Sequence, residues 1–152
     1  MGSIAFRRAA PDDLPAVVAL LADDPIGSER ESAGTPLDPR YAEAFSAIER
    51  DANQLLAVVD RDGRVIGVLQ LSFIPGLTRR GMWRGQIEGV RVATSARQGG
   101  VGRAMLEWAI EQCRKRGCGL VQLTSDKRRS GAHGFYEALG FRATHEGYKL
   151  SL

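Results

Sequence analysis

Three glycines lie close together in the second half of the chain, at Gly99, Gly100 and Gly102. An apolar stretch that ends at Val92 precedes them and an amphipathic one follows, so the run 97–102 predicts a turn from a strand into a helix. The first turn of a helix leaves about four backbone N–H groups unpaired and carries roughly +0.5 charge. Because glycine lets the main chain approach a ligand closely, the run predicts a phosphate-binding turn.

Two common phosphate-binding motifs do not fit this turn. A P-loop places Lys and then Ser or Thr directly after its last glycine, but Arg103 and Ala104 follow Gly102. A dinucleotide fingerprint needs a third glycine where Met105 stands, and a series of further strand–helix units that this chain lacks. The glycines alone are also compatible with a strand-to-helix turn that binds no ligand, so the rest of the sequence has to distinguish the two.

A second motif follows one predicted helix and one predicted strand later. It runs from Ala132 to Phe141 with the sequence AHGFYEALGF. Together the two motifs resemble the GNAT superfamily of acyl-CoA N-acyltransferases, whose signatures are Arg/Gln-x-x-Gly-x-Gly/Ala and Ala-x-x-Phe-Tyr-Glu-x-x-Gly-Phe. Arg97, Gly100 and Gly102 fill the first signature in register. The resemblance covers the whole chain and implies a single N-acetyltransferase domain, residues 1–152, that uses acetyl-CoA and no metal.

The resemblance also implies a fold and a set of cofactor contacts. The expected fold is α/β (α+β), with a mixed, mostly antiparallel sheet of six to seven strands flanked by about four helices. Its central strands are splayed to admit the pantetheine arm, and Gly89 would permit the bulge that this requires. The positions that match acetyl-CoA contacts are Val90, Arg91, Val92, Arg97, Gln98, Gly99, Gly100, Val101, Gly102, Arg103, Arg129, Ala132, Phe135 and Tyr136.

Arg129 departs from the family pattern. Many members place Asn three residues before the alanine that corresponds to Ala132, where it touches the cofactor. The planar guanidinium of Arg129 would instead bind a phosphate. A solvated basic turn over residues 127–129 is the alternative.

Acyl transfer to an amine requires a neutral amine, donors for a developing oxyanion and a proton for the departing thiolate. Glu88 is the candidate base, because burial in an apolar strand would raise its pKa and similar enzymes carry an acidic base on this strand. The alternative is that Glu88 points to solvent or pairs with an arginine. The resemblance places Tyr136 beside the sulfur of coenzyme A as the acid; the alternative is that Tyr136 only packs against Phe135. The resemblance also assigns the backbone N–H of Val92 as the donor to the oxyanion.

The acceptor is expected to be a primary amine of a small molecule or a peptide. The segment between Pro25 and Pro39 is loose and acidic, which suits a lid over a cationic amine. The candidate substrate contacts are Glu29, Phe73, Trp83, Glu88 and Ser125. A non-catalytic acyl-CoA sensor on the same fold is the alternative function.

Hydrophobic periodicity and turn residues predict the elements that position these groups. Strands are expected at 4–8, 55–59, 65–71, 86–92 and 120–124, with a terminal strand pair within 141–152. Helices are expected from Pro11 to about residue 23, and at 41–50, 102–116 and 132–139.

Composition narrows the class of protein further. The formal charge is +3 with a pI near 9.2, but the basic residues form short clusters without a stripe of stacking aromatics, so no nucleic-acid partner is expected. No apolar run approaches the roughly 20 residues of a membrane span, so the expected location is the cytoplasm, without a membrane partner. Two cysteines are too few for a structural zinc site. A homodimer is expected from the resemblance.

Overall fold

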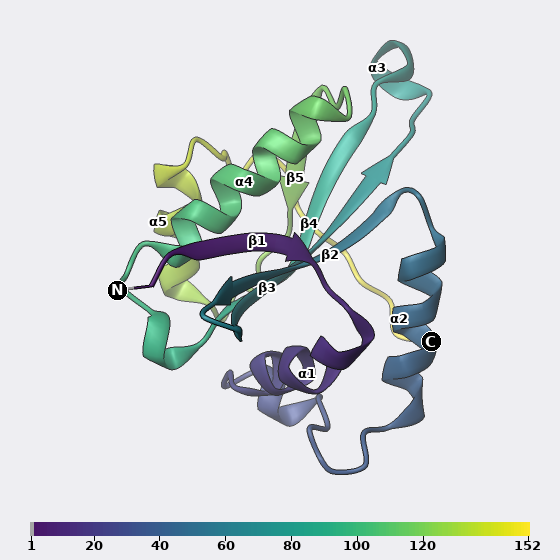
Figure 1. Ribbon diagram of the computed structural model, residues 1–152. Helices are drawn as coiled ribbons and strands as arrows, with labels where there is room; N and C mark the ends of the chain where they lie inside the picture. The colour runs from purple at the N-terminus through teal and green to yellow at the C-terminus, as the bar shows by residue number, and fades with distance from the viewer. Residues whose placement is uncertain (1) are drawn as a thin grey trace.

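The computed structural model describes residues 2–152 and, within that range, forms one five-stranded sheet in the order β1-β2-β3-β4-β5 (Figure 1). The pairs β1–β2, β2–β3 and β3–β4 are antiparallel, whereas β4 and β5 are parallel. This is the mixed, mostly antiparallel sheet that was expected, with fewer than six strands. The strands are β1 (Ile4–Arg8), β2 (Gln54–Arg61), β3 (Arg64–Ile74), β4 (Arg84–Val92) and β5 (Leu120–Leu123).

Five helices accompany the sheet in the described residues, one more than expected. The additional one, α3, is a single turn in which Arg79 and Arg80 take φ values of 56° and 61°, so it is a left-handed connection and not a regular helix. No helix among residues 2–152 is long and apolar enough to cross a bilayer. The helices are α1 (Leu14–Ala22), α2 (Pro39–Arg50), α3 (Thr78–Gly81), α4 (Val101–Lys115) and α5 (Ser130–Ala138).

The sheet is covered differently on its two faces. Along each strand successive side chains point to opposite faces. On one face, Leu71 and Ile87 pack against α4 in a core that includes Met105 and Leu106. On the other face, Val58 and Val68 form a smaller core with residues of α1 and α2 (Figure 1). We call these the α4 face and the α1/α2 face.

The turn between β2 and β3 shows why the hairpin forms. Asp62 and Gly63 take φ values of 53° and 80°, the left-handed pair of a tight hairpin turn. Asp60 Oδ1 accepts a hydrogen bond from the backbone N–H of Gly63 at 2.8 Å, which stabilises that turn. The predicted hairpin is therefore confirmed.

Strand β4 carries an irregularity where it parts from β5. Pairing with β5 stops at Ile87 and Leu123, although β4 continues to Val92. The register with β3 shifts between Val68 and Gln70, opposite Gly89, whose φ is +61°. The expected bulge at Gly89 is confirmed, because an extra residue on β4 needs this left-handed conformation. The last five residues of β4 thus lack β5 as a neighbour.

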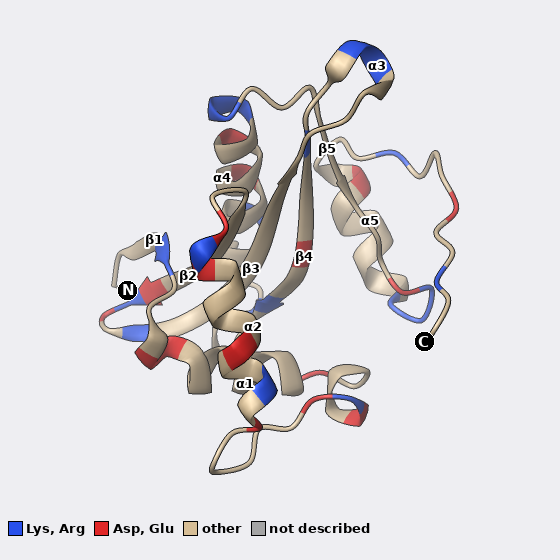
Figure 2. Ribbon diagram, turned by 90° about the vertical axis from the view of Figure 1, so that its right-hand side faces the viewer, with Lys and Arg blue, Asp and Glu red and all other residues tan. Residues whose placement is uncertain are grey.

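The expected terminal strand pair is wrong. The chain after α5 has no strand in residues 141–152, and all of Arg142–Leu152 is exposed. Figure 2 shows this segment, which we call the C-terminal tail, running from the far end of α5 along the outside of the molecule. Tyr148, Leu150 and Leu152 alternate along it with polar residues, and this pattern predicted a strand. Periodicity, however, does not specify the strand with which such a segment pairs.

Candidate functional site

Residues 97–102, which we call the glycine turn, lead into α4 and leave the start of this helix open. Gly100 caps the helix with φ +76°, and no side chain caps the first N–H groups. A Cβ built on Gly100 would meet nothing within 4 Å, so the space in front of the helix start is free. Gln98 also has a positive φ, 66°, which bends the chain into the turn. The arrangement offers unpaired backbone donors and the positive helix end to an anion, as expected for a phosphate cradle.

Arg97 ties the turn to neighbouring elements. Its Nε donates to the carbonyl of Val92 at 3.2 Å and its Nη2 donates to the carbonyl of Asp23 at 3.3 Å. The guanidinium therefore links the end of β4 to the segment that follows α1. In this position Arg97 fixes the turn relative to β4 and adds positive charge beside it.

Residues from three elements meet at the first turn of α4. A Cβ on Gly102 would lie 3.6 Å from Cζ of Phe135 on α5 and 3.8 Å from Cγ2 of Val92 on β4. The lack of a side chain at Gly102 thus allows α5 and the end of β4 to approach the helix start. The structure brings together the two sequence motifs that the linear chain separates.

The backbone N–H of Val92 points into the gap beside β4. Ala93 donates its N–H to the carbonyl of Ile66 on β3 at 2.8 Å. Consecutive residues of a strand direct their N–H groups to opposite edges, so the N–H of Val92 faces away from β3. On that side β5 has already ended, since its pairing stops at Leu123. A donor at this place suits a developing negative charge.

Tyr136 lies on α5 within an aromatic group. Its ring makes edge-to-face contacts with Phe135 at 5.3 Å and with Phe141 at 6.0 Å between centroids. Burial raises the pKa of the Tyr136 phenol above its ordinary value, while the positive charges of Arg129 and Arg91 oppose that rise. The phenol is therefore protonated at neutral pH and can donate a proton.

Glu88 is exposed, which corrects the expectation of a buried carboxylate. It lies on the α1/α2 face, where its Oε1 accepts a hydrogen bond of 2.5 Å from Nε2 of Gln86. The strand is apolar only on the α4 face, and the apolar residues around Glu88 in the sequence belong mostly to that face. Of the alternatives considered for Glu88, the solvent-exposed position is the observed one, and its hydrogen-bond partner is an amide and not an arginine.

An ion-pair cluster connects the segment after α1 with the start of α5. Arg129 donates to both oxygens of Asp24, at 2.6 Å and 2.8 Å, and Asp24 also accepts the N–H of Gly27 at 2.7 Å. Arg91 Nη2 lies 3.7 Å from the same carboxylate. The hydrogen bonds from Arg129 hold the pKa of Asp24 well below its usual range, and burial lowers the pKa of Arg91. Arg129 therefore binds a carboxylate, so the solvated basic turn considered as the alternative does not describe it.

Replacing Asp24 with alanine is expected to lower the free energy of unfolding by about 2–4 kcal/mol, because Arg129 and Arg91 would face each other unpaired. Asp24 is only 10% exposed, so solvent screens the cluster little. Its depressed pKa implies that this contribution is present above pH about 4 and is lost as the pH falls. Urea unfolding measures the change. Glu111→Ala, which removes an exposed helix pair, is the control and should cost less than about 0.5 kcal/mol. Equal effects of the two variants would contradict the assignment.

The predicted substrate residues do not form one group. Phe73 is buried on the α4 face, with the Arg116 guanidinium 4.2 Å from its ring centroid, so it belongs to the core and not to an acceptor wall. Trp83 is 37% exposed and directly precedes β4. Glu29 Oε2 lies 3.8 Å from Arg128 Nη1. The hydroxyl oxygen of Ser125 is buried and has no hydrogen-bond partner among residues 2–152. Glu29 therefore lies near the ion-pair cluster, whereas Trp83 directly precedes β4, the strand that carries Glu88.

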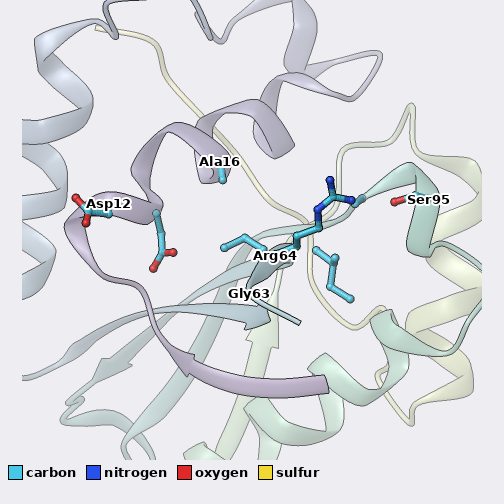
Figure 3. A pocket seen from close by; sticks show the side chains of 9 residues that line it. Asp12, Ala16, Gly63, Arg64 and Ser95 are labelled. Carbon is cyan, nitrogen blue, oxygen red and sulfur yellow. The ribbon is translucent and has the colours of Figure 1, made fainter. Parts of the chain in front are cut away.

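Two open cavities of about 490 Å³ lie near these elements. One lies between the start of α1 and the β2–β3 hairpin, where Figure 3 shows Asp12 and Ala16 on one side and Arg64 on the other. Glu88, Tyr136 and the glycine turn do not line it. The second cavity is lined by Asp24, Pro25, Ile26, Glu29, Arg128, Arg129, Ser130 and Gly131. It adjoins the ion-pair cluster and is thus the one closer to the predicted chemistry.

The cysteines contribute no evident chemistry. Cys113 and Cys118 are both free, and burial raises the pKa of the Cys113 thiol to about 11 and also raises that of Cys118. Thiols with raised pKa values are poor nucleophiles at neutral pH. Within residues 2–152 no group of three His, Cys, Asp or Glu side chains is placed to hold a metal ion.

The site thus combines an uncapped helix start, a strand that has parted from its neighbour and a protonated phenol. The family model described as acetyltransferase (GNAT) family matches residues 14–141. The chain therefore belongs to the GNAT acetyltransferase family.

Two curated relatives are N-acetyltransferases, enzymes that act on amines. The aminoalkylphosphonate N-acetyltransferase of Salmonella typhimurium is 29% identical over 97% of this chain and 90% of its own length. The glucosamine 6-phosphate N-acetyltransferase of Trypanosoma brucei brucei is 39% identical over 59% of each chain. Both names describe an amine that also carries a phosphorus-containing acid.

Solved structures agree with the fold. A transcriptional regulator from Bacillus halodurans is 45% identical and superposes with a TM-score of 0.96 over 99% of this chain and all of its own. A predicted acetyltransferase from Clostridium acetobutylicum, solved with acetyl-CoA, has a TM-score of 0.77 at 18% identity, covering 98% of this chain and 96% of its own. At that identity the second match supports the fold alone.

Proposed function

We propose that the protein transfers the acetyl group of acetyl-CoA to a primary amine of a small molecule or peptide, by direct attack in a ternary complex. The observation that carries the proposal is the meeting of Gly102, Val92 and Phe135 at the start of α4. This contact brings the start of α4, the end of β4 and the helix that carries Tyr136 together beside the gap in the sheet, which supports the proposal.

Different residues bind the donor, stabilise the developing charge and protonate the leaving thiolate. The unpaired amides of the glycine turn bind the diphosphate of the donor, which leaves the thioester to enter between β4 and β5. The backbone N–H of Val92 stabilises the negative charge on the carbonyl oxygen as the amine nitrogen attacks. When the carbon–sulfur bond breaks, Tyr136 gives its phenolic proton to the thiolate.

Glu88 is the proposed base. Because its carboxylate is exposed and precedes Val92 by four residues on β4, it accepts the proton of the amine through water. Glu88→Gln is expected to lower kcat/KM for the amine by about 100-fold at pH 7, with unchanged affinity for acetyl-CoA. The loss should shrink at higher pH, where more of the amine is already neutral. Thiol release measures the rate, Glu111→Gln is the control, and a full rate in Glu88→Gln would assign the base elsewhere.

The acceptor class rests on the curated relatives. Their substrates are small amines, an aminoalkylphosphonate and glucosamine 6-phosphate, so a small amine is a better candidate than a protein. An amine-library screen for acetyl-CoA consumption, with mass spectrometry of the product, tests this. Acetylation of protein amines alone would contradict it.

An acyl-CoA sensor is the second candidate, favoured by the 45% identical Bacillus halodurans protein described as a transcriptional regulator. A sensor needs the glycine turn but neither Glu88 nor Tyr136. The amine screen separates the two functions. Binding of acetyl-CoA without turnover on any amine would favour the sensor.

We also propose a homodimer in which the C-terminal tail is covered by a second copy. Leu150 in this tail is 87% exposed, and the outer edge of β5 has no strand beside it among residues 2–152. Leu150→Asp is expected to convert a dimer into a monomer of 16.5 kDa in light scattering. Leu77→Asp, at a site 96% exposed, is the control and should remain a dimer. A monomeric unmodified protein would rule out this assembly.

A further inference from the structure

Four polar side chains stand opposite one another across four strands of the sheet. In the register of the strands, Gln54 lies opposite Ser72, Ser72 opposite Gln86, and Gln86 opposite Gln122. Gln70, which pairs with Glu88 in the next row, contacts this group. We call Gln54, Gln70, Ser72, Gln86 and Gln122 the amide row. With neighbouring strands about 4.8 Å apart, the three steps from Gln54 to Gln122 span about 14 Å.

The amide row lies on the α1/α2 face, outside the core that the sheet forms with these helices. Val58 and Val68 mark this face, because they pack in the core formed with α1 and α2. Side chains an even number of residues away along the same strand point to the same face. Gln54 on β2 and Ser72 on β3 are each four residues from these valines and so lie on the α1/α2 face. All five members of the row are half-buried and none belongs to either hydrophobic core. The row is therefore a half-buried polar strip of this face that lies outside the two hydrophobic cores.

Hydrogen bonds order these side chains and connect them to the proposed base. Gln54 Oε1 accepts from Gln70 at 2.9 Å and from Ser72 at 3.0 Å. Gln122 donates to Oε1 of Gln86 at 2.8 Å, and Gln86 donates to Glu88 at 2.5 Å. These bonds use the Oε1 atoms of Gln54 and Gln86. The Nε2 group of Gln54 and the Oε1 atom of Gln122 take part in none of these hydrogen bonds, so each can bind a ligand.

The chemistry of the row differs from that of an ordinary solvated surface. Charged residues make up 26% of the chain, yet the five members of the row are neutral. Each carboxamide offers both a donor and an acceptor, as does each hydroxyl group of a sugar or polyol. Ligand sites commonly place a few ordered polar groups of this kind to fix orientation. The hydrogen bonds draw the polar ends of Gln54 toward β3 and of Gln122 toward β4. The groups that can contact a ligand therefore lie closer together than the about 14 Å between the outer strands, within reach of a small hydroxylated molecule.

We infer that the amide row is the specificity floor of the acceptor site and selects a small amine whose carbon frame carries hydroxyl groups. The hydroxyl groups bind Gln54, Ser72 and Gln122, and the amino group then lies at Glu88, two residues along β4 from Gln86. The inference rests on the proposed acetyl transfer and adds the substrate class. The five members of the row carry no charge, so the contacts assigned to them are hydrogen bonds to the hydroxyl groups of the acceptor.

The test compares matched acceptors in matched variants. The ratio of kcat/KM for glucosamine to that for cyclohexylamine is measured in the unmodified protein, in Gln122→Leu and in Gln54→Leu. The intrinsic reactivity of the two amines cancels when the ratio is compared between variants. Each leucine variant is expected to lower the ratio by about tenfold, because the hydroxyl groups lose their partners. Gln112→Leu, at a half-buried glutamine on α4, is the control and should leave the ratio within about twofold.

Two outcomes overturn the inference alone. One is an unchanged ratio in both row variants; the other is no turnover of glucosamine by an unmodified protein that binds acetyl-CoA and acetylates other amines. Because the two substitutions lie at opposite ends of the row, misfolding of one leaves the other informative. A protein that does not bind acetyl-CoA at all would overturn the proposed function, and this inference with it.

Discussion

Replacing Gly100 with aspartate is expected to weaken acetyl-CoA binding by at least about 100-fold. The carboxylate would occupy the open space in front of α4 and repel the diphosphate from the unpaired amides. The fold should survive, because aspartate is a favourable residue at a helix start and tolerates a positive φ better than most residues. Calorimetric titration measures the affinity, and urea unfolding measures the stability.

Two controls separate charge from backbone strain. Gly100→Asn introduces nearly the same shape without the charge and should weaken binding much less than aspartate. Gly117→Asp carries the same strain at the other end of α4, where φ is +77° and the Cβ position is also open. It should leave binding within about threefold. An equal loss of affinity in Gly100→Asp and Gly117→Asp would show that strain, and not a blocked anion site, is responsible.

Tyr136→Phe is expected to lower kcat by about 100-fold while the affinity for acetyl-CoA stays within about threefold. The ring keeps its contacts with Phe135 and Phe141, so the loss reports the hydroxyl group alone. Burial raises the pKa of the Tyr136 phenol, so the phenol stays protonated and the unmodified enzyme should not lose activity between pH 7 and 9 for lack of this proton. Steady-state thiol release measures the rate at each pH.

Tyr148→Phe provides the matched control for this substitution. Tyr148 is 92% exposed in the C-terminal tail, so removal of its hydroxyl group should leave kcat unchanged. Undiminished turnover in Tyr136→Phe would remove Tyr136 from the acid role. A parallel loss in both variants would point to a general effect on the protein.

Local features of the sequence were sufficient to predict most elements of the fold. The turn at Gly63, the bulge at Gly89 and the end of α4 at Gly117 each need a positive φ, which glycine supplies. The amphipathic pattern of α4 likewise indicates its buried face directly. These features depend on neighbouring residues, and for that reason a single sequence reveals them.

Features that depend on pairing between distant segments were not predicted. Asp24 and Arg129 are 105 positions apart, and nothing local marks them as partners. The burial expected for Glu88 failed because the apolar pattern of its strand belongs to the α4 face. Phe73 was misplaced for the same reason, since its face of the sheet depends on register.

The amide row was also missed, although a signal was present. Gln70 and Gln122 interrupt strands that are otherwise apolar in the sequence. A central strand covered on both faces is expected to be apolar throughout, so a glutamine in it indicates an uncovered part of the sheet. The alignment of the row across four strands, however, follows only from the observed register.

The most direct test of the account compares acetyl-CoA with S-acetyl-pantetheine, which carries the same thioester but no diphosphate. If the amides of the glycine turn hold the diphosphate, calorimetry should show acetyl-CoA binding at least about 100-fold more tightly, and Gly100→Asp should remove most of that difference. Equal affinities for the two compounds, or no binding of acetyl-CoA by the folded protein, would contradict it.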